Sequence, residues 1–462
     1  MKKYIMSLSL LGCAVLPPVE INAQDDKRPN FIVFIADDLG WEDIAPYGHP
    51  VIKTPNIDRI AAQGCRFDKV FLTASSSSPS RSSIMTAMYP HSTDAEILHK
   101  PLPETAEVVA TPLRGAGYFT ASVGKWHLGP NVKKQFDLVQ DYGGNRRNKM
   151  GNDWVAMIAN CPKDKPFFIW AGSNDPHRPY NDIKEVVYTP DDVIIPAYFP
   201  DTPGMRQDLA DYYNSIARFD KHVGMALDEL ERQGLMDNTV IMVMTDNGRP
   251  FPQCKTRTNQ QGMRTPLIIR YPGTVKKGST SNALISSIDI MPTILDIAGT
   301  SYSKEVDGIS FRQILSDPEA SFRKYAFAEH NWHNFMAYER AIYSERYIYS
   351  MNYLPDLPAT PPLDALRGAG YQSMILLWKE NKLKPEHSDC FIVPRPGEEL
   401  FDYLSDKDCM NNLVSERKFH KVHNELKKQL KKHAQKTSDK FPGRDKIRQE
   451  DLDRTTGEKL DK

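Results

Sequence analysis

The chain has 462 residues, and its 59 Lys and Arg balance 59 Asp and Glu, so the formal net charge is zero. This balance excludes a global attraction to nucleic acid or to an anionic membrane, and affinity for an anion has to come from a local pocket. The length, an apolar content of 40% and 34 prolines indicate a large buried core in two unequal lobes with many shaped loops.

Residues 1–23 have the pattern of an export signal. Two lysines near the start precede a short apolar run, and small residues near 21–23 offer a cleavage site. We therefore expect an exported, periplasmic protein. A lipoprotein anchored through Cys13 is the alternative, because Leu-Leu-Gly-Cys resembles a lipidation box. No later segment is apolar over a membrane-spanning length, so no transmembrane span is expected.

Residues 30–36 form a continuous apolar run that predicts a central strand of a parallel sheet, covered on both faces. Asp37 and Asp38 follow the run directly. A turn with a side-chain cap would explain one such pair. Two adjacent carboxylates are costly to bring together without a cation, however, which favours a hard metal ion.

Residues 75–87 are rich in serine but have apolar neighbours on both sides, unlike a solvated linker. Pro79 suits a first helical position, and Ser77 or Ser78 could cap that helix. Arg81 would then lie in the first turn, where a cation opposes the helix dipole unless an anion is bound. The stretch predicts an anion site at a helix N-terminus, with a hydroxyl held over it.

Three further apolar segments, 118–124, 166–172 and 239–245, are predicted strands that run into polar residues. These polar residues are Lys125, His127, His177, Asp246 and Asn247. Histidine in a strand-exit loop suits a general acid, because it titrates near neutral pH. Asp246 and Asn247 extend the oxygen ligands that begin at residue 37, a set that favours Ca²⁺ over zinc.

Several motifs in order resemble the formylglycine-dependent (type I) sulfatase family. Ser77-x-Pro79-Ser80-Arg81, followed by Thr86-Ala87, is similar to its signature C/S-x-P-S-R-x-x-x-x-T-G/A, with Ala where Gly is commoner. Residues 124–129 (Gly-Lys-Trp-His-Leu-Gly) match its second signature. Residues 175–178 and 246–256 are most similar to heparan N-sulfatases and their bacterial glycosaminoglycan-degrading relatives. The resemblance covers roughly residues 29–415 and is of the serine type.

The resemblance implies an alkaline phosphatase-like α/β fold, with a mixed, mostly parallel sheet between helices and a smaller C-terminal α+β subdomain. It implies that a sulfatase-maturating enzyme oxidises Ser77 to formylglycine, the nucleophile. It also implies that His127 hydrogen-bonds this group and that His177 protonates the leaving atom. Sulfate would be bound by Arg81, Lys125, His177 and Lys255, and Ca²⁺ by Asp37, Asp38, Ser77, Asp246 and Asn247.

The C-terminal part changes character near residue 318, where short alternating segments predict a small antiparallel sheet. We expect a catalytic domain at 24–317, a subdomain at 318–435 with a helix over 411–433, and a frayed polar tail at 436–462. His330 and His333 either pack in a corner or read the sugar over the pocket. Cys390 and Cys409 either pair or stay buried thiols.

The favoured interpretation is an exported sulfatase acting on sulfated amino sugars of glycosaminoglycans, with N-sulfoglucosamine as the first guess. One alternative keeps the fold but cleaves an O-sulfate of N-acetylglucosamine, N-acetylgalactosamine or galactose. A phosphatase-type relative would need a second metal site with added His and Asp ligands, which the sequence does not reveal. An inactive glycan-binding protein is the third alternative. No nucleic-acid partner is expected, and the oligomeric state stays open.

Overall fold

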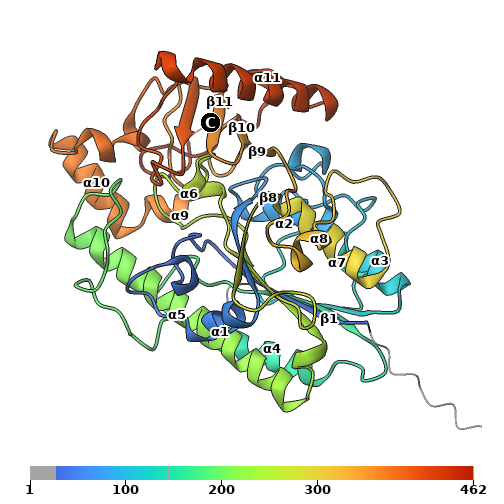
Figure 1. Ribbon diagram of the computed structural model, residues 1–462. Coiled ribbons are helices and arrows are strands. Elements are labelled where there is room, and N and C mark those ends of the chain that lie inside the picture. Colours follow the sequence, from blue (N-terminus) through green and yellow to red (C-terminus); the bar gives the residue numbers. More distant parts are fainter. Residues whose placement is uncertain (1–27, 144–145, 461–462) are drawn as a thin grey trace, which may run out of the picture.

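The computed structural model describes residues 28–143 and 146–460 and is built around an eight-stranded sheet (Figure 1). The strand order is β4-β3-β5-β1-β6-β7-β2-β8, and all pairings are parallel except those of β7. This confirms the predicted mixed, mostly parallel sheet. The strands are β1 Asn30–Ala36, β2 Cys65–Phe71, β3 Phe119–Gly124, β4 Leu138–Gln140, β5 Phe167–Gly172, β6 Thr239–Thr245, β7 Leu267–Arg270 and β8 Ser279–Ser286.

Helices cover both faces of this sheet, so the central strands are apolar on both sides. In β1, Phe31, Val33 and Ile35 pack into one core, and the alternate residues pack into the other. Figure 1 shows α1, α4 and α5 on one side and α2, α3, α7 and α8 on the other. Their bounds are α1 Pro55–Gln63, α2 Ser77–Thr86, α3 Ala110–Gly115, α4 Met150–Ala159, α5 Pro203–Arg232, α7 Ile290–Ala298 and α8 Arg312–Ser316.

The C-terminal lobe contains the predicted small antiparallel sheet, in the order β12-β11-β10-β9. Helix α11 covers it, and Leu426 and Leu430 pack on the sheet (Figure 1). The helix begins at residue 420, not 411, because Asn412 instead hydrogen-bonds the backbone of β12. The elements of this lobe and its junction are α6 Gln260–Met263, β9 Ala326–His330, β10 Glu339–Tyr343, β11 Tyr347–Asn352, α9 Leu363–Leu366, α10 Ala369–Lys379, β12 Glu398–Asp402 and α11 His420–Lys436.

The expectation of a frayed tail after residue 436 is wrong for the part that the structure describes. The Asp439 carboxylate accepts hydrogen bonds from buried Arg340 at 2.5 and 2.9 Å. Arg454 donates to the carbonyls of Met336 and Pro358 at 2.6 and 2.8 Å. Charge pairing and backbone hydrogen bonds hold this segment, so its low apolar content was misleading.

Some of the remaining predictions concern residues that the structure describes, and others concern residues that it does not. Cys390 and Cys409 are buried free thiols. The export signal at 1–23 and Cys13 lie outside the described residues, and the domain limits at 24–317 and 318–435 stay predictions. No helix within residues 28–143 and 146–460 is both long and apolar enough to cross a membrane.

We predict that Asp439→Asn lowers the free energy of unfolding by about 2 kcal/mol, because the buried Arg340 guanidinium loses one of its two charged partners and keeps only Glu329. Chemical denaturation measures this change. Asp445→Asn is the control, since Asp445 is an exposed carboxylate of the same tail. Equal stability of the two variants would show that the tail is not held by this ion pair.

Candidate active site

The predicted functional side chains meet at one edge of the large sheet because parallel strands end there together. Ala36 of β1 lies opposite Thr245 of β6, so Asp37 and Asp246 leave the sheet side by side. In the same way Gly124 of β3 lies opposite Gly172 of β5, which places Lys125 near the loop that carries His177. Residue 77 enters from α2, which follows β2.

Gly124 is required at the point where β3 delivers Lys125. Its φ is 98°, and an added Cβ would lie 1.8 Å from the carbonyl oxygen of Gly172. No side chain fits this close approach of two strand ends. The glycine therefore allows the lysine to leave the sheet directly beside the loop after β5.

Three carboxylates form the centre of the site. Asp37, Asp38 and Asp246 are at most 1% exposed, and one oxygen of each lies within 4.8 Å of the others. The Ser77 Oγ lies 3.1 Å from Asn247 Oδ1 and 3.3 Å from Asp37 Oδ1. The five residues proposed as metal ligands are thus one cluster.

The helix that carries residue 77 starts differently from the prediction. Ser76 is the N-cap, Ser77 is the first helical residue and Pro79 the third. Arg81 consequently lies beyond the first turn, and the argument that it opposes the dipole there was wrong. The predicted hydroxyl does lie at the N-terminus of this helix, and it is beside the acidic cluster.

Each carboxylate of the cluster pairs with one buried or nearly buried cation. Lys125 Nζ lies 2.6 Å from both oxygens of Asp37, and Lys255 Nζ lies 2.7 and 2.8 Å from those of Asp38. Arg81 Nε donates to Asp246 at 2.7 Å. The Arg81 Nη2 atom is buried and makes no hydrogen bond within the described residues. Positive donors therefore surround residue 77.

The pKa values of Asp37 and Asp38 are shifted in opposite directions. Burial alone would raise the pKa of Asp37, but Lys125, His177, Arg81 and Lys255 outweigh it and hold that pKa well below its usual range. The pKa of Asp38 is raised, because burial and the neighbouring carboxylates Asp37 and Asp246 raise it by more than the cations lower it. The cations that lower it are Lys255 and His177. A further cation would relieve this repulsion, and an all-oxygen donor set fits a hard divalent ion.

His177 presents one ring nitrogen to this cluster. Its Nδ1 lies 2.5 Å from the carbonyl oxygen of Arg178, so the ring is held from behind. Its Nε2 lies 3.7 Å from Asp38 Oδ2 and 3.6 Å from Asp364 Oδ2, longer than hydrogen bonds. The free nitrogen faces the site, as a proton donor to a bound substrate requires.

Asp364 was missed by the sequence analysis. It lies in α9 of the C-terminal lobe, yet it joins Asp38 and His177 in a second group of ligand atoms within 4.8 Å. The sequence contained no sign of this, because Asp364 follows a proline-rich stretch and belongs to no motif. One Asp beyond the predicted residues, Asp364, thus joins Asp38 and His177 beside the first cluster.

The expected hydrogen bond between His127 and residue 77 is not formed with the unmodified serine. No hydrogen bond joins the two side chains within the described residues; His127 Nε2 instead lies 2.8 Å from His99 Nδ1. Burial, with Lys125 and His99 adding, holds the pKa of His127 well below its usual value. His99, a second residue that the sequence analysis missed, thus fixes a neutral His127.

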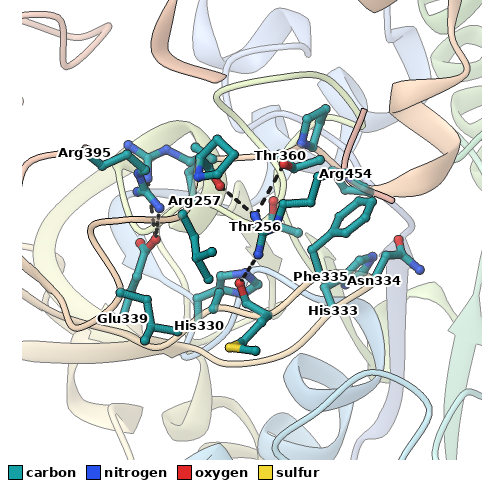
Figure 2. Close-up of a pocket in the computed structure, with 18 of the residues that line it drawn as sticks. Thr256, Arg257, His330, His333, Asn334, Phe335, Glu339, Thr360, Arg395 and Arg454 are labelled. Carbon is teal, nitrogen blue, oxygen red and sulfur yellow. Dashed lines mark hydrogen bonds and ion pairs between the residues drawn. The ribbon is translucent and has the colours of Figure 1, made fainter. Parts of the chain in front are cut away.

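His330 and His333 both line one small cavity of about 30 Å³, room for about one water, which Figure 2 shows beside Arg257 and Arg454. His333 also reaches the start of α2, where its Nδ1 lies 2.7 Å from the Oγ of Ser76, directly before residue 77. Burial and the nearby arginines lower the pKa of His330 to about 3. A shared role in reading the sugar stays a prediction.

Comparison with known proteins identifies the family of the chain. The Sulfatase family model matches residues 29–300, and the model of the C-terminal part of N-sulphoglucosamine sulphohydrolase matches residues 255–356. Human N-sulphoglucosamine sulphohydrolase is 31% identical over 58% of this chain and 61% of its own length. An ulvan-active sulfatase of Formosa agariphila is 26% identical over 87% of this chain and 74% of its own.

A solved structure has a similar fold. A protein in complex with its substrate D-glucosamine-2-N,6-O-disulfate has a TM-score of 0.68 at 21% identity, over 90% of this chain and 99% of that one. The likeness covers both lobes of the fold. Because the Sulfatase model matches more than half of the sequence, the chain belongs to the sulfatase family and is a sulfatase.

Proposed function

We propose that this protein is an exported sulfatase that removes sulfate from amino sugars of glycosaminoglycans, with N-sulfoglucosamine as substrate. The observation that carries the proposal is the Ser77 hydroxyl, which lies against Asp37, Asn247 and Lys125. Arg81 and Lys255 pair with the other two carboxylates of the same cluster. The choice of sugar is supported by the 31% identical human enzyme and by the family model over residues 255–356.

Two groups complete the proposed site. Ca²⁺ would be held by Asp37, Asp38, Asp246, Asn247 and residue 77, and formylglycine would replace Ser77 through a maturating enzyme. Together they supply a Lewis acid and a hydrated aldehyde, whose second hydroxyl allows sulfate to be released. An unmodified serine lacks that second hydroxyl.

The chain's own residues bind the sulfuryl group and move the proton. Lys125 and Lys255 end at the carboxylates of the cluster, so they lie beside any sulfuryl group bound there and neutralise its oxygens. His177 is held at Nδ1, which leaves Nε2 to protonate the leaving nitrogen or oxygen. His127 is kept neutral, and its buried Nδ1, which has no hydrogen-bond partner within the described residues, is the atom that would accept a proton of the nucleophile.

A second candidate is an O-sulfatase of the same fold. An N-acetylglucosamine-6-O-sulfatase of Bacteroides thetaiotaomicron is 24% identical over 70% of this chain and 77% of its own length. Human N-acetylgalactosamine-6-sulfatase is 26% identical over 63% of this chain and 66% of its own. These relatives make a sulfate ester of an amino sugar the alternative substrate.

We predict that the active enzyme has lost two hydrogens at Ser77. Peptide mass spectrometry of protein produced with and without a maturating enzyme measures this loss. Ser77→Ala should lower kcat by roughly 10³-fold or more, as removal of a nucleophile does. Full activity of a preparation whose Ser77 is wholly unmodified would refute the proposed nucleophile.

We expect Ca²⁺ to stabilise the protein through the acidic cluster, by about 2.7 kcal/mol at a hundredfold excess over Kd. Thermal unfolding with Ca²⁺ or with a chelator measures this. Asp246→Asn should abolish the response. Asp43→Asn is the matched control, since Asp43 is also buried and paired with an arginine, Arg249, but lies outside the cluster. A response that survives in Asp246→Asn would place the ion elsewhere.

The substrate assignment is tested with matured protein and defined sugars. N-sulfoglucosamine should be hydrolysed with a higher kcat/KM than glucosamine 6-sulfate, N-acetylglucosamine 6-sulfate and N-acetylgalactosamine 6-sulfate. Released sulfate is measured for each. A preference for one of the esters would favour the second candidate.

A further inference from the structure

Asp364 is a half-buried acid beside the active site that the mechanism above does not use, with 27% of its side chain exposed. Its Oδ2 atom is inaccessible to solvent and makes no hydrogen bond within residues 28–143 and 146–460. The same atom lies 3.6 Å from His177 Nε2, and Asp38 completes the group. A carboxylate oxygen without a donor is costly to bury, so this one has a missing partner.

The position of Asp364 is fixed by its surroundings. The backbone N–H of Leu363 donates to Asn334 Oδ1 at 2.9 Å, and that of Leu366 donates to the Pro362 carbonyl at 2.8 Å. The tail contacts the same helix, because a Cβ at Gly457 would lie 2.4 Å from Leu363 Cδ1. The segment that carries the acid is therefore braced on two sides.

The distance between Asp364 and His177 leaves room for one substrate atom between them. His177 Nε2 is the proton donor, and its distance of 3.6 Å from Asp364 Oδ2 is too long for a direct hydrogen bond. An atom placed about 2.9 Å from His177 Nε2 can lie equally close to Asp364 Oδ2. The leaving atom thus meets a donor on one side and an acceptor on the other.

We propose that Asp364 selects sulfamates over sulfate esters by accepting the N–H of the leaving nitrogen. This inference rests on the proposed function. In a sulfamate the bridging nitrogen carries one hydrogen and one lone pair, which match Asp364 and His177 respectively. In an ester the bridging oxygen has no hydrogen, so its second lone pair faces the carboxylate and is repelled.

The reaction balances with these groups alone. The S–N bond breaks and its electron pair remains on nitrogen, which takes the Nε2 proton of His177. The sulfuryl group passes to the oxygen nucleophile at residue 77, whose hydroxyl proton goes to His127, and the sugar leaves as a neutral amine. Asp364 keeps its charge throughout and gains and loses only a hydrogen bond.

The test compares two substrates that differ only in the bridging atom, glucosamine 2-N-sulfate and glucose 2-O-sulfate. In matured enzyme, Asp364→Ala should lower kcat/KM for the sulfamate on the order of 10–100-fold, the usual effect of losing a hydrogen bond to a charged group. The value for the ester should stay or rise. Asp356→Ala is the control, since its exposed carboxylate pairs with Arg444 in the same lobe.

Two outcomes would overturn the proposal. An equal loss for both substrates, in Asp364→Ala and Asp364→Asn alike, would make Asp364 a structural or His177-orienting residue. A requirement for a second divalent ion, lost in Asp364→Ala with both substrates, would make it a metal ligand. Either result would leave the proposed function intact.

A binding measurement separates this inference from the proposed function. Calorimetry on protein with unmodified Ser77 should show weaker binding of glucosamine to Asp364→Ala than to wild type. Binding of glucose, which lacks the amine, should be unchanged. If the sulfamate is never hydrolysed, the proposed function fails, and the amine binding still decides whether Asp364 recognises an N–H donor. Unchanged glucosamine binding would overturn its role.

Discussion

The repulsion among three carboxylates with almost no access to water is the constraint on which the rest of this structure depends. Like charges at such short distances are tolerated only if opposite charge surrounds them. Arg81, Lys125 and Lys255 provide it, and each arrives from a different segment of the chain. The ends of β1, β3 and β6, the start of α2 and the loop after β6 are consequently fixed relative to one another.

The backbone at this edge is also held in an uncommon conformation. Asp38, His127 and Thr256 have φ values of 72°, 62° and 71°, in the left-handed region that non-glycine residues rarely adopt. Three such residues around one site indicate that the packed sheet below them fixes the loops. The same rigidity keeps the cations beside residue 77, where a sulfuryl group needs them already oriented.

The sequence predicted best those features that depend on neighbouring residues, such as the bounds of a strand. The bounds of β1 and β6 were predicted to the residue, because each is an apolar run ended by charged side chains. The shared position of Asp37 and Asp246 followed from the geometry of parallel strands. Motif resemblance led to Ser77, Lys125, His177 and Lys255, and the structure brings these side chains to one place.

The sequence was uninformative where a contact joins distant segments without a motif. Asp364 and His99 have their partners on other elements, and nothing in the neighbouring residues indicates them. The tail was misjudged because an ion pair with Arg340 stabilises it in place of an apolar stripe. The start of α11 was placed too early, because Asn412 bonds to a strand that periodicity does not reveal.

The contact between Gly457 and Leu363 bears on the order in which the protein is assembled. Gly457, which lies against the acid-bearing helix α9, and Arg454, which holds the segments before that helix through Met336 and Pro358, leave the ribosome long after α9. Until these residues emerge, α9 lacks the contacts that the tail makes on this side of the pocket. Ser77 on α2 has by then been synthesised for a long time. The nascent chain therefore offers an open pocket around its serine before synthesis closes it.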